Sequence, residues 1–166
     1  MVDADGPFID LGALKSQVTS YSSSLRHENC GVSVTKEGSS TKIQLLDPDS
    51  TGYLNMTAAE LAKLGGGSKI DGFKSGHNGA VVINVDCTGV SDIYTPDGDG
   101  MTIVIDGDAK TNGEYVQHNF GRVIFNFINA EGKTIHVAST IFGMLLAPGA
   151  TIITGGGVNG SMIADN

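Results

Sequence analysis

Aspartates gather in turns at two places in the sequence, and carboxylate oxygens at alternate positions are ligands that calcium prefers. The segment DPDSTG opens like a calcium loop of the EF-hand type, with oxygen ligands and a turn-forming glycine at Asp47, Asp49, Thr51 and Gly52. Its twelfth position is Ala58, where such a loop needs a glutamate. We therefore interpret DPDSTG as a turn from a strand into a helix.

The second acidic region contains the turns PDGDG and DGDA. Asp-Gly pairs are first of all turn signals, because both residues tolerate turn conformations. If the two turns lie one above the other, their carboxylates would share a cation. Calcium therefore stays the alternative to having no cofactor, at Asp97, Asp99, Asp106 and Asp108.

No spacing in the sequence is typical of an enzyme active site. The histidines lack the H-E-x-x-H pattern and any spacing that puts two on one face: His27, His77, His118 and His136. No serine stands in a G-x-S-x-G elbow. Polysaccharide cleavage needs carboxylates raised on one groove, for which the plausible residues are Asp86, Asp106 and Asp108. We predict no catalytic residue and no enzyme, with a carbohydrate-active β-helix enzyme as the alternative.

Ice binding is a further alternative, and it requires a flat array of regularly spaced threonines. The threonines that would form it do not keep one register along the sequence: Thr102, Thr134 and Thr151. The pattern therefore argues against an ice-binding face.

Asn126 stands in the middle of the strand-like run VIFNF, between Phe125 and Phe127. Side chains alternate between the faces of a strand, so Asn126 points away from both aromatic rings. We predict that it is buried in a ladder of hydrogen bonds. The alternative is an exposed amide that contacts a ligand.

The composition bounds the class of protein. The chain of 166 residues suits a single domain, 1–166, and 40% hydrophobic residues are too many for a disordered polymer. Its 24 glycines follow no every-third-residue period, which excludes collagen. The net charge of −8 repels phosphate backbones, so we predict no nucleic-acid partner. No apolar run approaches the roughly 18 residues of a membrane span, so this segment is not expected to insert into a membrane.

The elements that position these residues fall into three regions. In region 10–28 the apolar residues recur at helical spacing and predict an amphipathic helix that docks through one stripe: Leu11, Leu14, Val18, Tyr21 and Leu25. Asp10 is the expected N-cap, and Asn29 with Gly31 the expected stop. Region 32–75 predicts a hairpin around Glu37–Ser40 and a short helix within residues 57–64, capped by Thr57 and Glu60.

Region 80–166 is rich in β-strand patterns separated by glycine and aspartate turns. Apolar runs begin at Val81, Met101, Val123 and Ile141, a spacing near 20 residues. Such a spacing fits one coil of a β-solenoid, in which each coil buries an inward aliphatic stripe. We therefore predict a mainly β fold, a β-solenoid or β-helix-like stack with the docked helix and one short helix. A β-sandwich of α+β character is the alternative.

The two cysteines, Cys30 and Cys87, have neither C-x-x-C spacing nor a histidine close by. A single disulfide between them and two buried free thiols are equally compatible with the sequence.

Three segments in order resemble the C-terminal half of the choice-of-anchor A domain, an adhesive domain of bacterial surface proteins. They are PFIDLGALKSQVTSYSSSL at residues 7–25, VIFNFINAEGKTIHV at residues 123–137 and FGMLLAPGATIITGGGVNGSMIADN at residues 142–166. Leu11 stands where the family has an aromatic residue, and Met144 where it has a small one. The glycine-rich strands that precede the helix in the family are absent, which would leave one strand edge unpaired.

The resemblance implies an exported, non-catalytic module on the bacterial cell surface, often in the cell wall of Gram-positive species. The chain would then be an excised part of a larger surface protein, whose signal and anchor lie elsewhere. Its expected partners are an extracellular protein or glycan ligand and other domains of the same surface protein. We expect it to bind a host matrix or glycan ligand, or to serve as a rigid spacer.

Overall fold

The computed structural model describes residues 10–64, 67–96, 101–110 and 119–165. The protein is mainly β, as predicted. Its helical elements are α1 (Leu11–Ser24), α2 (Ala58–Leu61) and the 3-10 turn η1 (Phe120–Arg122). The strands are β1 (Val32–Glu37), β2 (Ser40–Leu45), β3 (Thr51–Thr57), β4 (Lys69–Phe73), β5 (Ala80–Asp86), β6 (Asp92–Tyr94), β7 (Thr102–Ile105), β8 (Asp108–Lys110), β9 (Val123–Ile128), β10 (Thr134–Val137), β11 (Ile141–Ala147), β12 (Thr151–Thr154) and β13 (Val158–Ala164).

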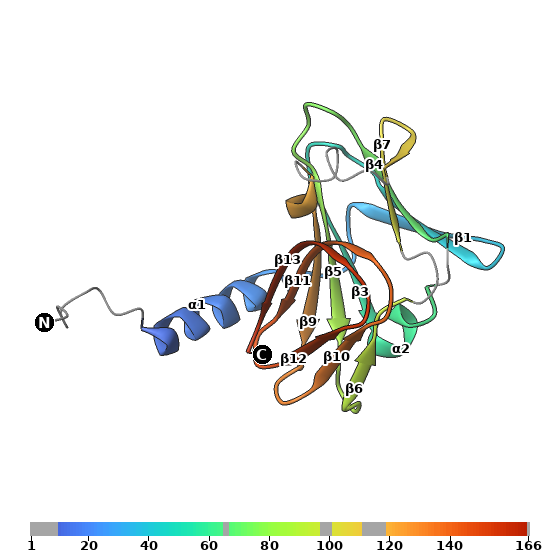
Figure 1. The fold of residues 1–166 in the computed structure, drawn as a ribbon. Coiled ribbons are helices and arrows are strands. Elements are labelled where there is room, and N and C mark those ends of the chain that lie inside the picture. The colour runs from blue at the N-terminus through green and yellow to red at the C-terminus, as the bar shows by residue number, and fades with distance from the viewer. Residues whose placement is uncertain (1–9, 65–66, 97–100, 111–118, 166) are drawn as a thin grey trace, which may run out of the picture.

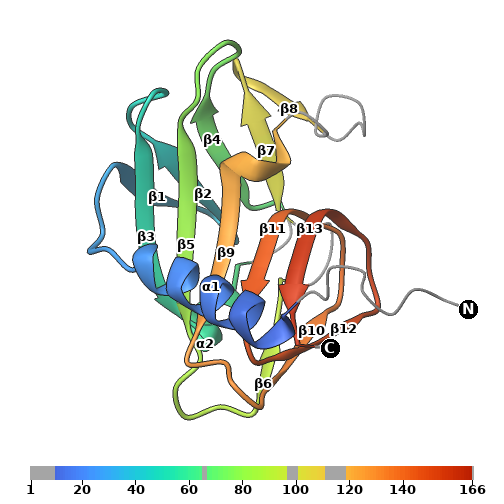
Figure 2. The ribbon, with the colours of Figure 1, turned by 90° about the vertical axis from the view of Figure 1, so that its left-hand side faces the viewer.

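These strands form three sheets (Figures 1 and 2). Their orders are β1-β2-β4-β7-β8, β13-β11-β9-β5-β3 and β12-β10-β6. Pairing is parallel throughout the second and third sheets, whereas the first begins and ends with the antiparallel pairs β1–β2 and β7–β8. From β4 onward the chain visits the three sheets in turn, first as β4, β5 and β6 and then as β7, β9 and β10. This pairing differs from that of an antiparallel sandwich.

The expected 20-residue repeat is wrong in one respect. Val81 pairs with Val123, so the runs at Val81 and Val123 are direct neighbours in one sheet. The run Met101–Ile105 contributes β7 to another sheet, where Ile103 pairs with Ile70. Apolar composition is the same for every inward stripe, so it does not reveal which sheet a run joins.

The core lies between the inner faces of the three sheets. Each sheet supplies alternate aliphatic or aromatic side chains, and the largest that are fully buried include Phe73, Phe125, Phe127, Ile43, Ile70, Ile83, Ile93, Ile135 and Leu145. The parallel register stacks like residues, as in the row Ile83–Phe125–Leu145. The aliphatic interior is therefore continuous from strand to strand.

Helix α1 lies across the outer face of the sheet β13-β11-β9-β5-β3, as the docking prediction requires (Figure 2). The predicted stripe is wrong in part, because Leu11, Leu14 and Tyr21 are 72%, 47% and 45% exposed. The side chains that pack on the sheet include Val18 and Ser22, the latter fully buried. Ser22 faces the sheet because it satisfies a buried amide there, as described below.

Local signals are confirmed at both helices. The Asp10 carboxylate accepts from Ala13 N at 3.0 Å. At α2, Thr57 Oγ1 accepts from Glu60 N while the Glu60 carboxylate accepts from Thr57 N at 2.7 Å, a complete capping box. Helix α1 ends at Ser24, before the expected stop, and Asn29 instead accepts from Asn55 N through its side chain at 2.6 Å.

Candidate functional site

The outer face of the sheet β6-β10-β12 presents two straight rows of side chains. The first row is Asp92, Thr134 and Thr151, and the second is Tyr94, His136 and Ile153. The strands alternate, so the residues between these rows, such as Ile93 and Ile135, point into the core. We call this surface the β6-β10-β12 face.

The β6-β10-β12 face carries an aromatic pair beside a carboxylate. The rings of Tyr94 and His136 are stacked with centroids 4.7 Å apart, and Tyr94 is 53% exposed. His136 Nε2 lies 2.8 Å from Asp92 Oδ1, and Ser91 Oγ donates to Asp92 Oδ2 at 2.8 Å. The hydrogen bond with His136, followed by that from Ser91, lowers the pKa of Asp92. The result is a fixed carboxylate next to an accessible phenol ring.

The three threonines do not keep one register, as expected, although two of them are neighbours. Thr134 and Thr151 are direct partners on neighbouring parallel strands, whereas Thr102 lies in β7 of another sheet and pairs with Lys69. The sequence separation of two parallel strands depends on the length of the loop between them, so it does not reveal this register.

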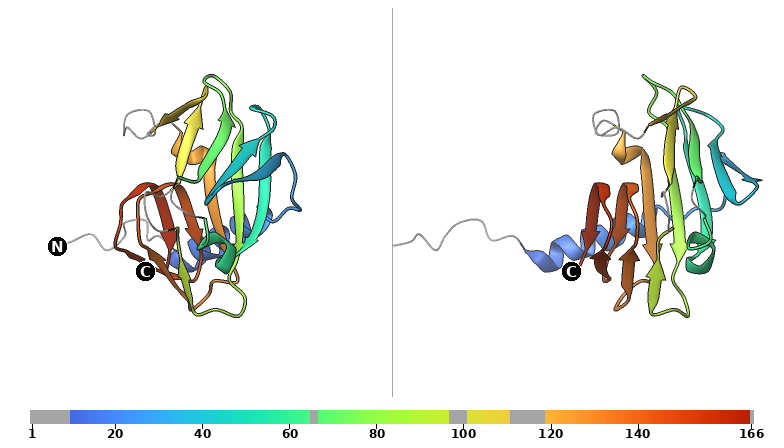
Figure 3. Two further views of the ribbon diagram at one scale, coloured as in Figure 1. Left: turned by 90° about the vertical axis from the view of Figure 1, so that its right-hand side faces the viewer. Right: turned by 45° about the vertical axis from the view of Figure 1, so that its right-hand side comes forward.

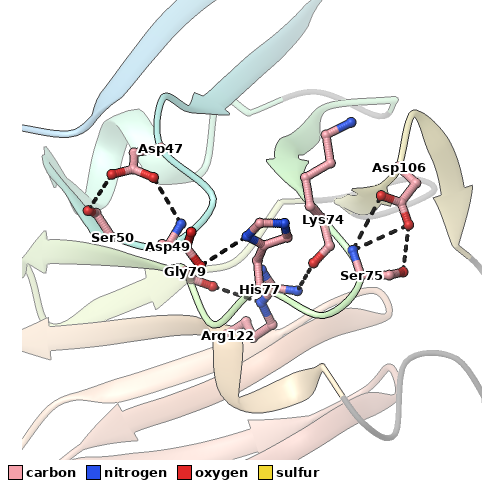
Figure 4. A network of polar contacts seen from close by, with 9 residues as sticks. All are labelled: Asp47, Asp49, Ser50, Lys74, Ser75, His77, Gly79, Asp106 and Arg122. Atoms are coloured by element: carbon pink, nitrogen blue, oxygen red, sulfur yellow. Dashed lines mark hydrogen bonds and ion pairs between the residues drawn. The ribbon is translucent and has the colours of Figure 1, made fainter.

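A second group of polar residues lies where loops of successive strands meet (Figure 4). His77 Nδ1 is 3.0 Å from Asp49 Oδ1, which links the loop before β5 to the turn before β3. The Asp106 carboxylate accepts from Ser75 Oγ at 2.5 Å, which links the same loop to the turn between β7 and β8. The hydrogen bonds from Ser50 and the Asp49 backbone lower the pKa of Asp47.

Arg122 holds this loop cluster in place, and the sequence analysis did not single it out. Its Nε donates to the Gly79 carbonyl at 2.7 Å and its Nη1 to the Lys74 carbonyl at 3.2 Å. The guanidinium lies 4.7 Å above the Phe73 ring, and burial lowers the pKa of Arg122. A lone arginine after a loop gives no sequence signal for such a role, because its acceptors are backbone carbonyls.

Of the four calcium candidates, the structure describes Asp106 and Asp108. Asp97 and Asp99 lie outside the described residues. Asp106 and Gly107 make the tight turn between β7 and β8, in which Ile105 pairs with Asp108. Over the described part of the chain, no three His, Cys, Asp or Glu side chains lie close enough to hold a metal ion.

The turn at Asp47 joins two strands, β2 and β3, and this corrects the expected strand-to-helix step. The helix follows only after β3, where the capping box of Thr57 starts it. A turn with Asp at its first position suits either connection, so the sequence did not distinguish them.

Asn126 is buried in a ladder, as predicted. Asn55, Asn84 and Asn126 are register partners on β3, β5 and β9. Asn126 Nδ2 donates to Asn84 Oδ1 at 2.8 Å, and Asn84 Nδ2 to Asn55 Oδ1 at 3.1 Å. Ser22 Oγ donates to Asn126 Oδ1 at 2.6 Å, and the Ser22 carbonyl accepts from Asn126 Nδ2. The ladder therefore fastens α1 to the sheet.

Of the carboxylates proposed for the enzyme alternative, Asp106 and Asp108 belong to one turn, whereas Asp86 lies apart from them. Asp106 contacts Ser75 in the loop before β5, and Asp86 is the last residue of β5. A strand of this length separates its two ends by roughly 20 Å. Asp86 accepts from Thr88 and Asn129, and the hydrogen bonds from Asn129 and Thr88 lower its pKa. Asp86 and Asp106 therefore do not share a groove.

The histidines that the structure describes are satisfied one at a time. His77 and His136 each contact a different aspartate, and the His27 ring lies 4.3 Å from that of Tyr53. His118 falls outside the described residues. Ser161 lies in β13, in register with Met144.

Both cysteines are free thiols. Cys30 is exposed, whereas Cys87 is buried, so the expectation of two buried thiols holds for Cys87 alone. Burial raises the pKa of Cys87 to about 11. Neither residue is placed as a metal ligand or redox pair.

The β6-β10-β12 face is accessible to solvent, whereas the ladder is buried and the loop cluster joins loops of the β framework. Residues 2–166 match the family described as "Putative Ice-binding-like adhesive domain". The chain belongs to this adhesive-domain family. No curated protein and no solved structure matches it. Neither helix that the structure describes in this adhesive domain is long and apolar enough to cross a bilayer.

Proposed function

We propose that this adhesive domain is a non-catalytic, adhesin-like module on the bacterial cell surface, of the choice-of-anchor A type. The match of residues 2–166 to an adhesive-domain family carries this proposal. It also supports a location on the cell surface or outside the cell.

The architecture suits this role. We interpret the strands that return to each sheet as coils of an incomplete β-helix. Hydrogen bonds between parallel strands run along the stack, and the aliphatic interior is continuous. A framework of this kind resists bending, so it serves either to present a binding face or to space a partner from the cell wall.

We further propose that the β6-β10-β12 face contacts the ligand. An accessible phenol ring supplies a large contact area with a polar end, and such residues dominate binding energies. The C–H face of a sugar ring packs on an aromatic ring, while a fixed carboxylate such as Asp92 accepts from its hydroxyl groups. Tyr94 and Asp92 therefore favour a glycan over a host matrix protein.

An array of glycans and matrix proteins, probed with the purified chain, tests this function. The matched variants are Tyr94→Ala and Tyr21→Ala, which remove two tyrosines of similar exposure on different surfaces. We expect saturable glycan binding that Tyr94→Ala weakens at least about tenfold and Tyr21→Ala leaves unchanged. Equal binding by all three proteins would place the ligand elsewhere, and binding to nothing on the array would leave the spacer role.

Two alternatives have direct tests. Turnover of a neutral or acidic glycan that Asp106→Asn with Asp108→Asn abolishes would make the protein a carbohydrate-active enzyme. The family description and the Thr134–Thr151 pair favour an assay for thermal hysteresis. Measurable hysteresis would establish ice binding.

A further inference from the structure

At one end of the strand stack, which we call the bare end, no described element covers the edge strands. The bare end consists of β12 and β13, the edge strands of the two parallel sheets. Met162 of β13 is 50% exposed. Met162 pairs with Leu145, a core residue, so the inward stripe of the sheet reaches solvent here. No described strand pairs with the outer edge of β13.

Helix α1 extends past the bare end (Figure 3). An α-helix rises about 5.4 Å per turn and strands lie about 4.8 Å apart, so one turn covers one strand. Along α1, Leu25 accepts from Asn84 of β5 through its carbonyl, Ser22 bonds Asn126 of β9, and Lys15 bonds Asp165 just after β13. By this count, the first turn of α1 extends beyond β13, over the position that one further strand of the sheet would occupy.

The first turn of α1 presents apolar side chains on which such a strand would pack. Leu11 and Leu14 line a mainly apolar groove of about 370 Å³ together with Ile163, Ala164 and Pro148, and the ion pair of Lys15 with Asp165 also borders it. The strands of the bare end, TIIT and VNGSMIA, contain neither charge nor proline. Natural edge strands usually carry such residues to prevent pairing with another chain.

The opposite end of the stack is covered. Beyond β3, Cys30 exchanges two backbone hydrogen bonds with Tyr53, and the β1–β2 hairpin and α2 follow. Head-to-tail association of two copies would need both ends open. A contact between the bare ends of two copies needs only that end, and such a two-fold contact is complete with two subunits.

We propose that the bare end is the interface of a two-fold homodimer. In this dimer β13 of each copy pairs with β13 of the other, and the first turn of each α1 packs on the partner's sheet. A second copy fits because the chain has a net charge of −8 while β12 and β13 are uncharged, so close approach is least opposed there. The dimer also joins two β6-β10-β12 faces into one longer surface. The proposal does not depend on what that face binds.

Light scattering after size-exclusion chromatography of the full chain, over a wide concentration range, tests the proposal. We expect a monomer–dimer equilibrium. Met162→Lys and Leu11→Lys place a charge at the interface from a strand and from the helix, and each is expected to raise the dissociation constant at least about tenfold. Val34→Lys is the matched control on β1, since Val34 is 49% exposed at the covered end.

Amide hydrogen exchange at β13 gives a second readout, because pairing slows exchange of its outward amides as concentration rises. A chain that stays monomeric overturns the proposal and leaves another polypeptide as the occupant of the bare end. Growth into larger assemblies, or a dimer that only Val34→Lys weakens, overturns it as well.

Discussion

The two ends of the strand stack solve the problem of an exposed edge differently. At the covered end, the short helix α2 places the fully buried Leu61 in the main core, and Leu64, which follows the helix, is 7% exposed. At the bare end the corresponding inward residue, Met162, is half exposed. The difference teaches that the described residues provide a helical cap at one end only. Side chains near β3 should therefore contribute more to the free energy of unfolding, whereas side chains near β13 should contribute more to association with a second copy.

Truncation of one inward-facing side chain at each end tests this comparison most strongly. Leu61→Ala opens a cavity at the covered end and should lower the free energy of unfolding by about 3 kcal/mol. Met162→Ala removes a half-exposed side chain and should cost less than about 1 kcal/mol in the monomer. Urea unfolding at low protein concentration measures both, and equal losses would show that the bare end is packed like the covered one.

Because the asparagine ladder joins α1 to β3, β5 and β9, the attachment of α1 should depend on these strands at the covered end of the sheet. Asn126→Ala leaves Asn84 Oδ1 and the Ser22 hydroxyl and carbonyl without their partner, which should cost about 2 kcal/mol. Leu14→Ala, on the overhanging half of α1, serves as the control and should change stability by less than about 0.5 kcal/mol. Thermal unfolding compares them, and a larger loss for Leu14→Ala would contradict the ladder's role.

The capping box sharpens the comparison at the start of α2. Thr57→Ala removes both side-chain contacts to Glu60, so it should destabilise the protein by about 1 kcal/mol. Thr19→Ala on the exposed side of α1 should have an effect within about 0.5 kcal/mol. Unchanged urea midpoints for both would mean that α2 is held by Leu61 without help from its cap.

The smallest effect is expected where α1 meets the bare end. The hydrogen bond from Lys15, 2.6 Å long, lowers the pKa of Asp165. Such a group stabilises the folded state above its unfolded pKa, near 4, and this contribution is lost as pH falls through its folded value. The free energy of unfolding of the wild type should therefore be slightly higher than that of Asp165→Asn at pH 7, and the difference should shrink as the pH falls below about 4 or in 1 M salt. A gap that persists in high salt would point to a contact other than charge.

Local features of the fold were predictable because each depends on a few neighbouring residues. Asp10 and Thr57 cap their helices, the turn at Glu37–Ser40 closes the hairpin, and the alternation around Asn126 puts that amide opposite two phenylalanines. The partners of Asn126 were not predictable, because Ser22 and Asn84 come from other parts of the chain.

The site residues show the same division. Asp106 was recognised as a turn residue, but its bond to Ser75 joins loops of different strands. The pairing of Tyr94 with His136 gave no sequence signal, because neither residue belongs to a motif. Loop lengths between parallel strands vary, so the residues that share a row do not recur at a fixed spacing.

By itself, the sequence determined the mainly β character, the helix starts, the hairpin and the burial of Asn126, since propensity and alternation act over a few residues. Only the tertiary structure decided which strands are neighbours, which side of α1 meets the sheet and which end of the stack has no cover. Parallel pairing joins segments far apart in the chain, and the contact of helix with sheet is set by the ladder beneath it. These choices depend on the whole stack, because each strand is placed by the strands and the helix that pack beside it.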